Sequence, residues 1–203
     1  MQKHRLKMLF TSLLMALSVV PVAQAAPFLG SQFHMRLGLL SSSFYGPTTG
    51  SNWVPYTFDL EYEIFSSNRS SYTIRSILSF DISTSRMAYA FTGLGRRYYL
   101  NSSGLRYEQE SGISGDRVTT IPRFRTYVGA KLGVSQVRVK DFGPALQIPS
   151  TLFDLGPDLG AIYQITPSLG VEMNAGASLG LGFSSVSVTG ISYYLFLGGS
   201  YFF

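Results

Sequence analysis

Apolar residues alternate with polar or small residues along most of the chain. The clearest stretch is 169–183, where Leu, Val, Met, Ala and Phe occupy the odd positions and Gly, Glu, Asn and Ser the even ones. A period of two places successive side chains on opposite faces of a β-strand. The pattern predicts eight strands, at 32–45, 53–65, 72–82, 87–99, 124–139, 152–165, 169–183 and 191–203. Alternation is least regular in 87–99, so the facing of that strand stays open.

The predicted strands are longer than those of ordinary soluble sheets, which average about 5 to 6 residues. An extended segment of about 15 residues measures roughly 50 Å, and a tilt of about 45° lets it rise roughly 35 Å, enough to cross a membrane. An even number of strands also returns the chain to the side where it began. We therefore predict an all-β fold, an antiparallel up-and-down transmembrane β-barrel of eight strands.

The two faces of these strands differ in charge. The apolar faces carry almost none, whereas the opposite faces carry both signs, and we predict that these charges face the lumen and pair there. The predicted lumen charges are Arg36, Asp59, Glu61, Glu63, Arg75, Asp81, Arg125, Lys131, Asp158 and Glu172. The alternative is a soluble periplasmic ligand-binding barrel, which would bury its apolar face and put its charges in water.

Aromatic residues gather near the predicted strand ends, as expected for the two girdles of a membrane barrel. One level consists of Tyr45, Trp53, Tyr56, Phe153, Phe183 and Tyr193, and the other of Phe33, Phe65, Tyr72, Tyr163, Tyr201 and Phe203. Glycines on the predicted inner faces, at 129, 133, 176, 180 and 182, leave some room. A narrow passive channel for ions or small solutes is therefore the alternative to a lumen plugged by charged pairs.

One connection is too long for a tight turn. Segment 100–123 holds several glycines and mixed charges, and we expect a hairpin in it, from 105–110 and 117–121. We interpret 101–122 as a periplasmic insert or as an extension of the flanking strands.

The first 25 residues have the three parts of a secretory signal peptide. Lys3, Arg5 and Lys7 precede an apolar run at 8–20, and Ala23-Gln24-Ala25 forms a small-residue cleavage site. The run is too short for a membrane-spanning helix, which needs about 20 apolar residues. We predict cleavage after Ala25, export from the cytoplasm, and one barrel domain at 26–203. The chain has no cysteine, which excludes a lipoprotein anchor and disulfides.

Charge and chemistry narrow the possible functions. Removing the three cations of the signal peptide reduces 16 Lys and Arg to 13, against 11 Asp and Glu, and this balance argues against a nucleic-acid partner. Only His34 remains as a histidine after the signal peptide, so we predict no catalytic residue, no cofactor and no metal. Asp59, Glu61 and Glu63 could hold calcium, but pairing with Arg75 is the preferred interpretation.

The carboxy terminus resembles the signal that the bacterial outer-membrane assembly machinery reads, here Gly198, Tyr201 and Phe203. The segments 93–99 (GLGRRYY) and 127–133 (YVGAKLG) are similar to paired segments in small outer-membrane barrels. The chain thus resembles the family that contains the membrane-anchoring domain of outer membrane protein A, without a periplasmic domain. The resemblance implies a Gram-negative outer-membrane protein with a structural or surface-interaction role. The implied partners are outer-membrane lipid, lipopolysaccharide and the assembly machinery.

Overall fold

The computed structural model describes residues 30–45, 50–81, 86–100, 106–109, 117–120, 122–137, 150–182 and 188–203. The predicted signal peptide lies outside the described residues. No helix in the described part of the chain is long and apolar enough to span a membrane.

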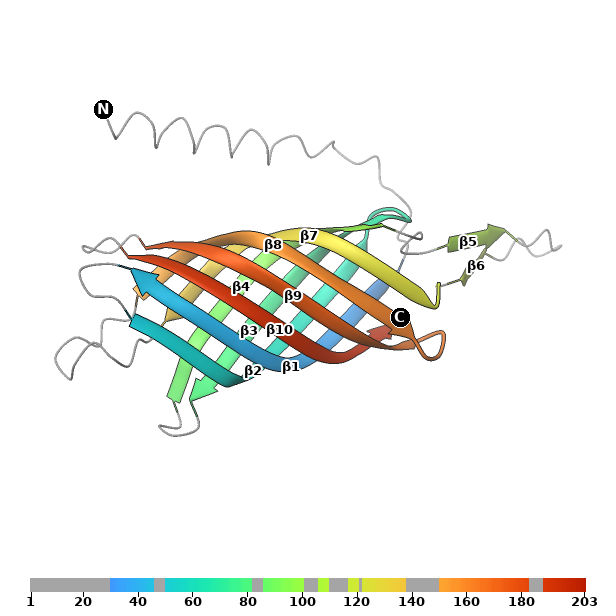
Figure 1. Ribbon diagram of the computed structural model, residues 1–203. Helices are drawn as coiled ribbons and strands as arrows, with labels where there is room; N and C mark the ends of the chain where they lie inside the picture. The colour runs from blue at the N-terminus through green and yellow to red at the C-terminus, as the bar shows by residue number, and fades with distance from the viewer. Residues whose placement is uncertain are drawn as a thin grey trace, which may run out of the picture.

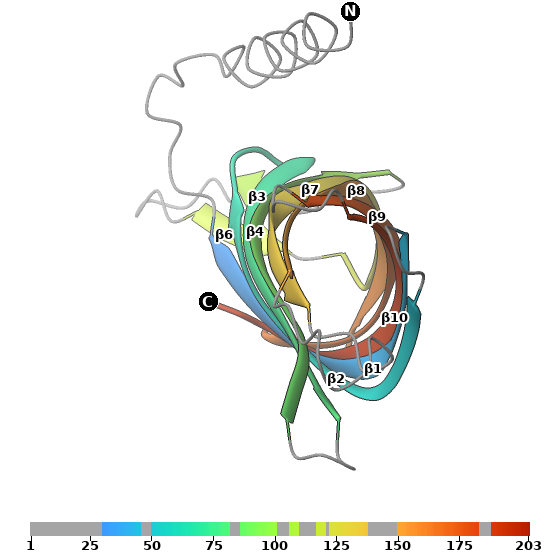
Figure 2. The same cartoon turned by 90° about the vertical axis from the view of Figure 1, so that its left-hand side faces the viewer.

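Eight long strands form a closed antiparallel barrel, which confirms the predicted fold. They are β1 (Ser31–Tyr45), β2 (Gly50–Phe65), β3 (Ser70–Asp81), β4 (Arg86–Tyr99), β7 (Phe124–Val137), β8 (Ser150–Gln164), β9 (Leu169–Gly182) and β10 (Thr189–Phe202). The strands run obliquely around the barrel (Figure 1), and the view along its axis shows them closing into a ring (Figure 2). The predicted boundaries agree with the observed ones to within three residues.

The first and last long strands close the barrel. β1 pairs with β10 along its whole length, from Gln32 opposite Phe202 to Tyr45 opposite Thr189. Closure leaves the barrel without an unpaired strand edge, the condition that backbone groups must meet in lipid.

The fourth long strand contains one irregularity in its pairing. The register between β3 and β4 shifts after Ser79, which lies opposite Tyr89, whereas Phe80 lies opposite Met87. The shift lies at the loop-end start of β4, and from Tyr89 to Tyr99 the odd positions face inward without interruption.

The long connection contains a hairpin of its own. β5 (Arg106–Gln109) and β6 (Arg117–Thr120) pair antiparallel and form a two-stranded sheet separate from the barrel sheet. Figure 1 places this hairpin beyond the end of the barrel that carries the carboxy terminus. The described strands of this hairpin therefore do not lengthen β4 or β7.

The two ends of the barrel differ in their connections. We call one the turn end, where 66–69 joins β2 to β3 and 165–168 joins β8 to β9, and the other the loop end. At the turn end the Ser66 and Ser67 amides both bond the Ser70 carbonyl, and the Ile165 amide bonds the Leu169 carbonyl. The chain finishes at the same end, where the Phe203 amide donates to the Ser31 carbonyl.

Candidate functional site in the barrel interior

The strands place apolar side chains outside and charged ones inside. Met35, Leu197 and Tyr193 are each about three-fifths exposed, at 59%, 61% and 59%. The buried charged residues are Arg36, Arg75, Arg97, Arg125 and Lys131, with Asp59, Glu61, Glu63, Asp154, Asp158 and Glu172, and His34 is buried among them. We call these twelve residues the interior cluster.

Nine of the ten predicted lumen charges are buried in this cluster, and the side chain of Asp81 lies outside the described residues. Sequence reasoning missed Arg97, because Arg96 and Tyr98 give the other face of β4 the same residue types as Arg97 and Tyr99. His34 and Asp154 do lie on the polar faces of alternating segments, but they were not among the predicted pairing charges. The alternation is the signal that could have identified both.

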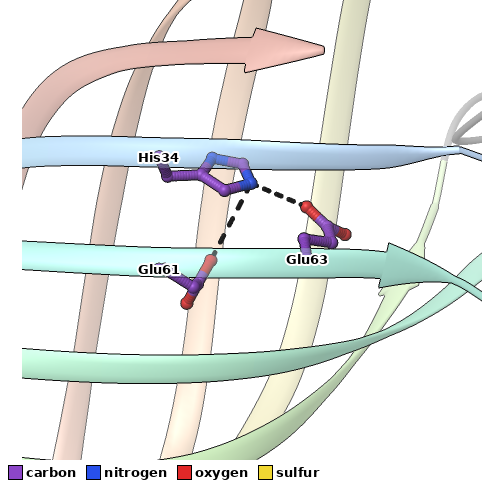
Figure 3. Close-up of side chains that lie close together, drawn as sticks. All are labelled: His34, Glu61 and Glu63. Atoms are coloured by element: carbon purple, nitrogen blue, oxygen red, sulfur yellow. Dashed lines mark hydrogen bonds and ion pairs between the residues drawn. The ribbon is translucent and has the colours of Figure 1, made fainter. Parts of the chain in front are cut away.

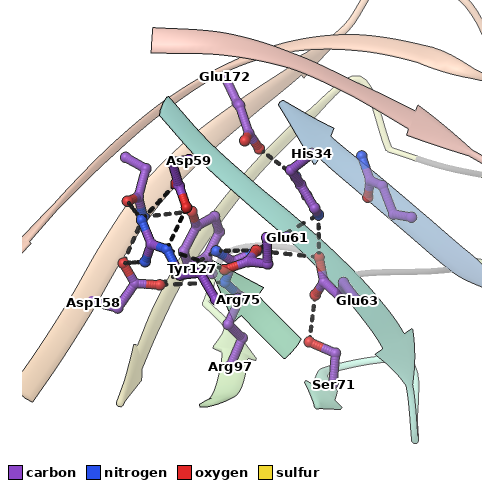
Figure 4. A network of polar contacts seen from close by, with 12 residues as sticks. His34, Asp59, Glu61, Glu63, Ser71, Arg75, Arg97, Tyr127, Asp158 and Glu172 are labelled. Carbon is purple, nitrogen blue, oxygen red and sulfur yellow. Dashed lines mark hydrogen bonds and ion pairs between the residues drawn. The ribbon is translucent and has the colours of Figure 1, made fainter. Parts of the chain in front are cut away.

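Arg75 on β3 is the centre of the interior cluster (Figure 4). Its Nε and Nη2 donate to the two carboxylate oxygens of Asp59 at 2.8 and 2.7 Å. Nη1 donates to Asp158 at 3.1 Å, and Nη2 also donates to the Asn174 side-chain oxygen at 2.7 Å. One face of the guanidinium lies 4.9 Å from the centre of the Tyr194 ring. This planar, bidentate geometry is what an arginine provides and a lysine cannot.

Arg36 and Arg97 extend the network around the lumen. Arg36 Nε lies 2.7 Å from Asp59 and 3.1 Å from Glu172. Arg97 contacts Glu61 at 2.5 Å and Asp158 at 3.3 Å. The three arginines thereby join β1, β3 and β4 to carboxylates of β2, β8 and β9. The charges therefore have partners across the lumen, as buried charges require.

His34 lies between carboxylates of two other strands, Glu61 and Glu63 on β2 (Figure 3) and Glu172 on β9 (Figure 4). Its Nε2 is 2.8 Å from Glu63 and 3.9 Å from Glu61, and its Nδ1 is 2.7 Å from Glu172. Glu63 also accepts hydrogen bonds from the hydroxyls of Ser71 and Tyr99. The ring is therefore held by acidic groups on both sides.

His34, Glu61 and Glu63 also have the ligand types of a divalent metal site. One ligand atom from each of the three lies within 4.8 Å of the others. Arg97 contacts Glu61 and Glu63, and Arg36 contacts Glu61, so a metal ion would have to displace these ion pairs. The contacts in the structure are thus those of an ion-pair network, and the metal group is only a geometric possibility.

Apolar side chains fill the lumen on both sides of the interior cluster. Toward the loop end lie Leu40, Phe44, Ile77, Tyr89, Phe91, Val137, Leu152, Tyr194 and Phe196, the upper apolar cluster. Toward the turn end lie Phe65, Tyr99, Tyr127 and Ile162, packed against Phe202, the lower apolar cluster. Phe65 was predicted in the outer girdle, but it faces inward and stacks on Tyr99 with ring centres 5.6 Å apart.

The inner-face glycines do not leave the open space expected for a narrow pore. A Cβ added at Gly160 would lie 2.5 Å from the Tyr127 hydroxyl oxygen and 2.7 Å from the Met173 carbonyl oxygen. One added at Gly176 would overlap the Tyr194 ring. The glycines thus let these two rings lie against the barrel wall, and the rings occupy the room that the missing side chains leave.

The three residues of the predicted assembly signal lie near the turn-end part of β10. Gly198 lies opposite Arg36, and a Cβ there would meet the Arg36 Cα at 2.6 Å. The Tyr201 and Phe203 rings are exposed on the outer surface and meet edge to face with centres 5.0 Å apart. Gly198 therefore has a packing role, whereas the two aromatic rings are accessible.

An apolar outer wall around a charged interior is the arrangement of a transmembrane β-barrel. A soluble ligand-binding barrel would have the reverse arrangement, so the structure contradicts that alternative. The fold and the interior together define a small eight-stranded transmembrane barrel, the architecture of the small outer-membrane barrel proteins.

Neither a protein-family model nor a curated protein matches the sequence. The structure is similar to the N-terminal β-barrel domain of Pseudomonas aeruginosa OprF, with 13% identity, 86% of this chain and 99% of that chain covered, and a TM-score of 0.48. Neisserial surface protein A is 14% identical, with 83% of this chain and 96% of that chain covered and a TM-score of 0.45. The outer membrane protease OmpT from Escherichia coli is 9% identical, with 91% of this chain and 99% of that chain covered and a TM-score of 0.46. At these identities the similarity concerns the fold alone.

Proposed function

We propose that the chain is an integral outer-membrane protein with a structural or surface-interaction role and a lumen closed to ions. The observation that carries this proposal is the filling of the interior along the length of the barrel. The ion pairs of Arg36, Arg75 and Arg97 lie between the upper apolar cluster toward the loop end and the lower apolar cluster toward the turn end. Barrels of about eight strands have interiors only wide enough for side chains to fill.

Opening this lumen would be costly. Any continuous water path must displace aromatic rings at both ends and part the ion pairs of Arg36, Arg75 and Arg97. Leaving one member of a buried pair without its partner costs about 3–5 kcal/mol. The proposal assigns no catalytic role to His34, because both of its ring nitrogens already contact carboxylates.

Conductance in a planar lipid bilayer tests the closed lumen. A denaturing gel, on which unboiled and boiled samples migrate differently, first shows that the refolded protein is inserted. From this protein we expect no discrete current steps. Steps whose ion preference changes in a Glu61→Gln variant would instead establish a pore lined by the interior cluster.

The narrow passive channel is the second candidate, and one observation favours it. The ammonium group of Lys131 on β7 is buried and makes no hydrogen bond to a described residue. Such a group is commonly satisfied by buried water. A hydrated pocket on this side would shorten the distance that an ion must cross, and the same bilayer recording distinguishes the two candidates.

We further propose that export depends on a signal peptide at residues 1–25 and assembly on Gly198, Tyr201 and Phe203. The exposed rings of Tyr201 and Phe203 support this role, because the assembly machinery could reach them. Fractionation of cells producing the full chain tests both ideas. We expect the wild-type protein in the outer-membrane fraction, with Ala26 as its first residue. The Phe203→Ser variant should give a much smaller amount of protein in that fraction. An equal yield of the variant would remove Phe203 from the signal.

A further inference from the structure

The lipid-facing wall of the barrel carries a single charged side chain among the strand residues whose side chains the structure describes. This residue is Arg96 on β4, and it is exposed. Its neighbours across the sheet are Tyr72 on β3 and Ala130 on β7. The Arg96 guanidinium carbon lies 5.5 Å from the centre of the Tyr72 ring, so the charge is stacked on an aromatic of the outer surface.

Arg96 has no carboxylate partner within the described part of the chain. Each of the six carboxylates with a described side chain is buried inside the barrel, and Arg96 forms none of the ion pairs found there. The barrel wall separates this cation from the anions of the interior cluster. No described residue therefore neutralises Arg96 on the outer wall, where an anion of the surrounding lipid could pair with it.

The position of Arg96 along its strand indicates what those surroundings are. Arg96 precedes Tyr99, the last residue of β4, by three positions, and the exposed ring of Tyr98 lies near the same end. A charge at the middle of the bilayer is expensive, whereas near the interface it costs little. Tyrosines at this level mark the depth of the lipid head groups.

Two more arginines are exposed at the same end of the barrel. The Arg69 carbonyl accepts a hydrogen bond from the Tyr99 amide at 2.8 Å, and the Arg123 carbonyl accepts one from Gln164 at 2.7 Å. These bonds place Arg69 and Arg123 at the turn end, near the edges of β4 and β7. The exposed charged side chains described at this rim are thus all arginines.

We propose that Arg96, stacked on Tyr72, binds the phosphate of an anionic phospholipid head group, and that Arg69 and Arg123 strengthen the attraction. A guanidinium donates two parallel hydrogen bonds to phosphate oxygens, which suits it to this ligand. Basic residues at a membrane surface attract anionic lipids in the same way. The inference rests on the proposed membrane location, with the turn end in the periplasmic leaflet.

Lipid retention after reconstitution tests the site. The full chain is refolded into vesicles of phosphatidylcholine mixed with phosphatidylglycerol, extracted in mild detergent, and its bound lipid is identified by native mass spectrometry. We expect the wild type to retain phosphatidylglycerol over phosphatidylcholine, and the preference to fall roughly fivefold or more in Arg96→Gln. Arg96→Lys should keep part of it, and added salt should weaken it.

Thr92→Gln is the matched control, because Thr92 is exposed on the same face of the same strand, farther from the turn end. It should leave the lipid preference unchanged. Equal retention of phosphatidylglycerol by wild type and Arg96→Gln would overturn the inference. Protein that fails to insert into these vesicles would instead overturn the proposed membrane location, so the two failures are distinguishable.

Discussion

At the scale of single residues, glycine and tyrosine act as pairs on the inner wall. Gly160 leaves the space that the Tyr127 ring occupies, and Gly176 does so for Tyr194. Glycine within a strand usually weakens it, since it has no side chain to pack and loses more conformational entropy. Here the ring of another strand supplies the missing packing, so these glycines make room for two inward-facing tyrosines.

This pairing predicts that a side chain at Gly160 is harmful. Gly160→Val would push against the Tyr127 ring and the Met173 carbonyl, and we expect it to lower the free energy of unfolding by about 1–3 kcal/mol. Gly199→Ala is the control, because its added Cβ would meet only the Gly170 carbonyl oxygen, at 3.6 Å. Urea titration in micelles measures both. A variant at 160 as stable as the wild type would mean that Tyr127 can move away.

At the scale of the strand, each element presents two surfaces with different solvents. β10 shows this clearly, since Leu195 and Leu197 face outward while Tyr194 and Phe196 are buried. The outward residues are apolar in mid-strand and aromatic near the turn end, at Tyr201 and Phe203. This gradient matches a hydrocarbon layer bordered by interfaces.

The gradient predicts that the cost of a charge depends on its depth. Leu195 lies near the centre of β10, so Leu195→Arg should cost about 2–4 kcal/mol of unfolding free energy in a bilayer. Tyr201 lies near the strand end, and Tyr201→Arg should cost only about 0–1 kcal/mol through its charge. Reversible unfolding from vesicles gives both values. Equal costs at the two positions would argue against a bilayer around this wall.

At the scale of the whole molecule, the interior cluster joins strands that do not pair with each other in the barrel sheet. Arg75 on β3 reaches Asp158 on β8, and His34 on β1 reaches Glu172 on β9. The described interior holds five Lys and Arg side chains and six carboxylates, with one histidine among them. Charges of both signs are therefore nearly balanced. Their contacts cross the lumen, whereas backbone hydrogen bonds join only adjacent strands.

A double-mutant cycle measures the coupling energy between Arg75 and Asp59. Arg75→Met should lower the unfolding free energy by about 3–5 kcal/mol, because Asp59 and Asp158 lose their guanidinium. Asp59→Asn should also be destabilising. The double variant should lose less than the sum of the two, by about 0.5–3 kcal/mol, since the pair acts as a unit. Strict additivity would mean that the two side chains do not depend on each other.

The order of hydrophobic and polar residues by itself determined the strands, their number and their two faces. Alternation is a local property of an extended chain, so Leu39, Leu195 and Arg75 could each be given a face without knowledge of their neighbours. The prediction failed where residue type does not distinguish the two faces. Arg96 and Arg97 are consecutive and lie on opposite faces of β4, and Phe65 was taken for a girdle aromatic although it faces inward.

Only the tertiary structure decided how the interior is used. Which carboxylate each arginine reaches depends on the closure and register of the barrel, which bring Asp158 to Arg75 and Glu172 to His34 across 83 and 138 positions of sequence. The same holds for the rings of Tyr127 and Tyr194, which lie over glycines of other strands. A sequence pattern indicates which side chains point inward, but packing inside the closed barrel determines whether they leave a channel or fill it.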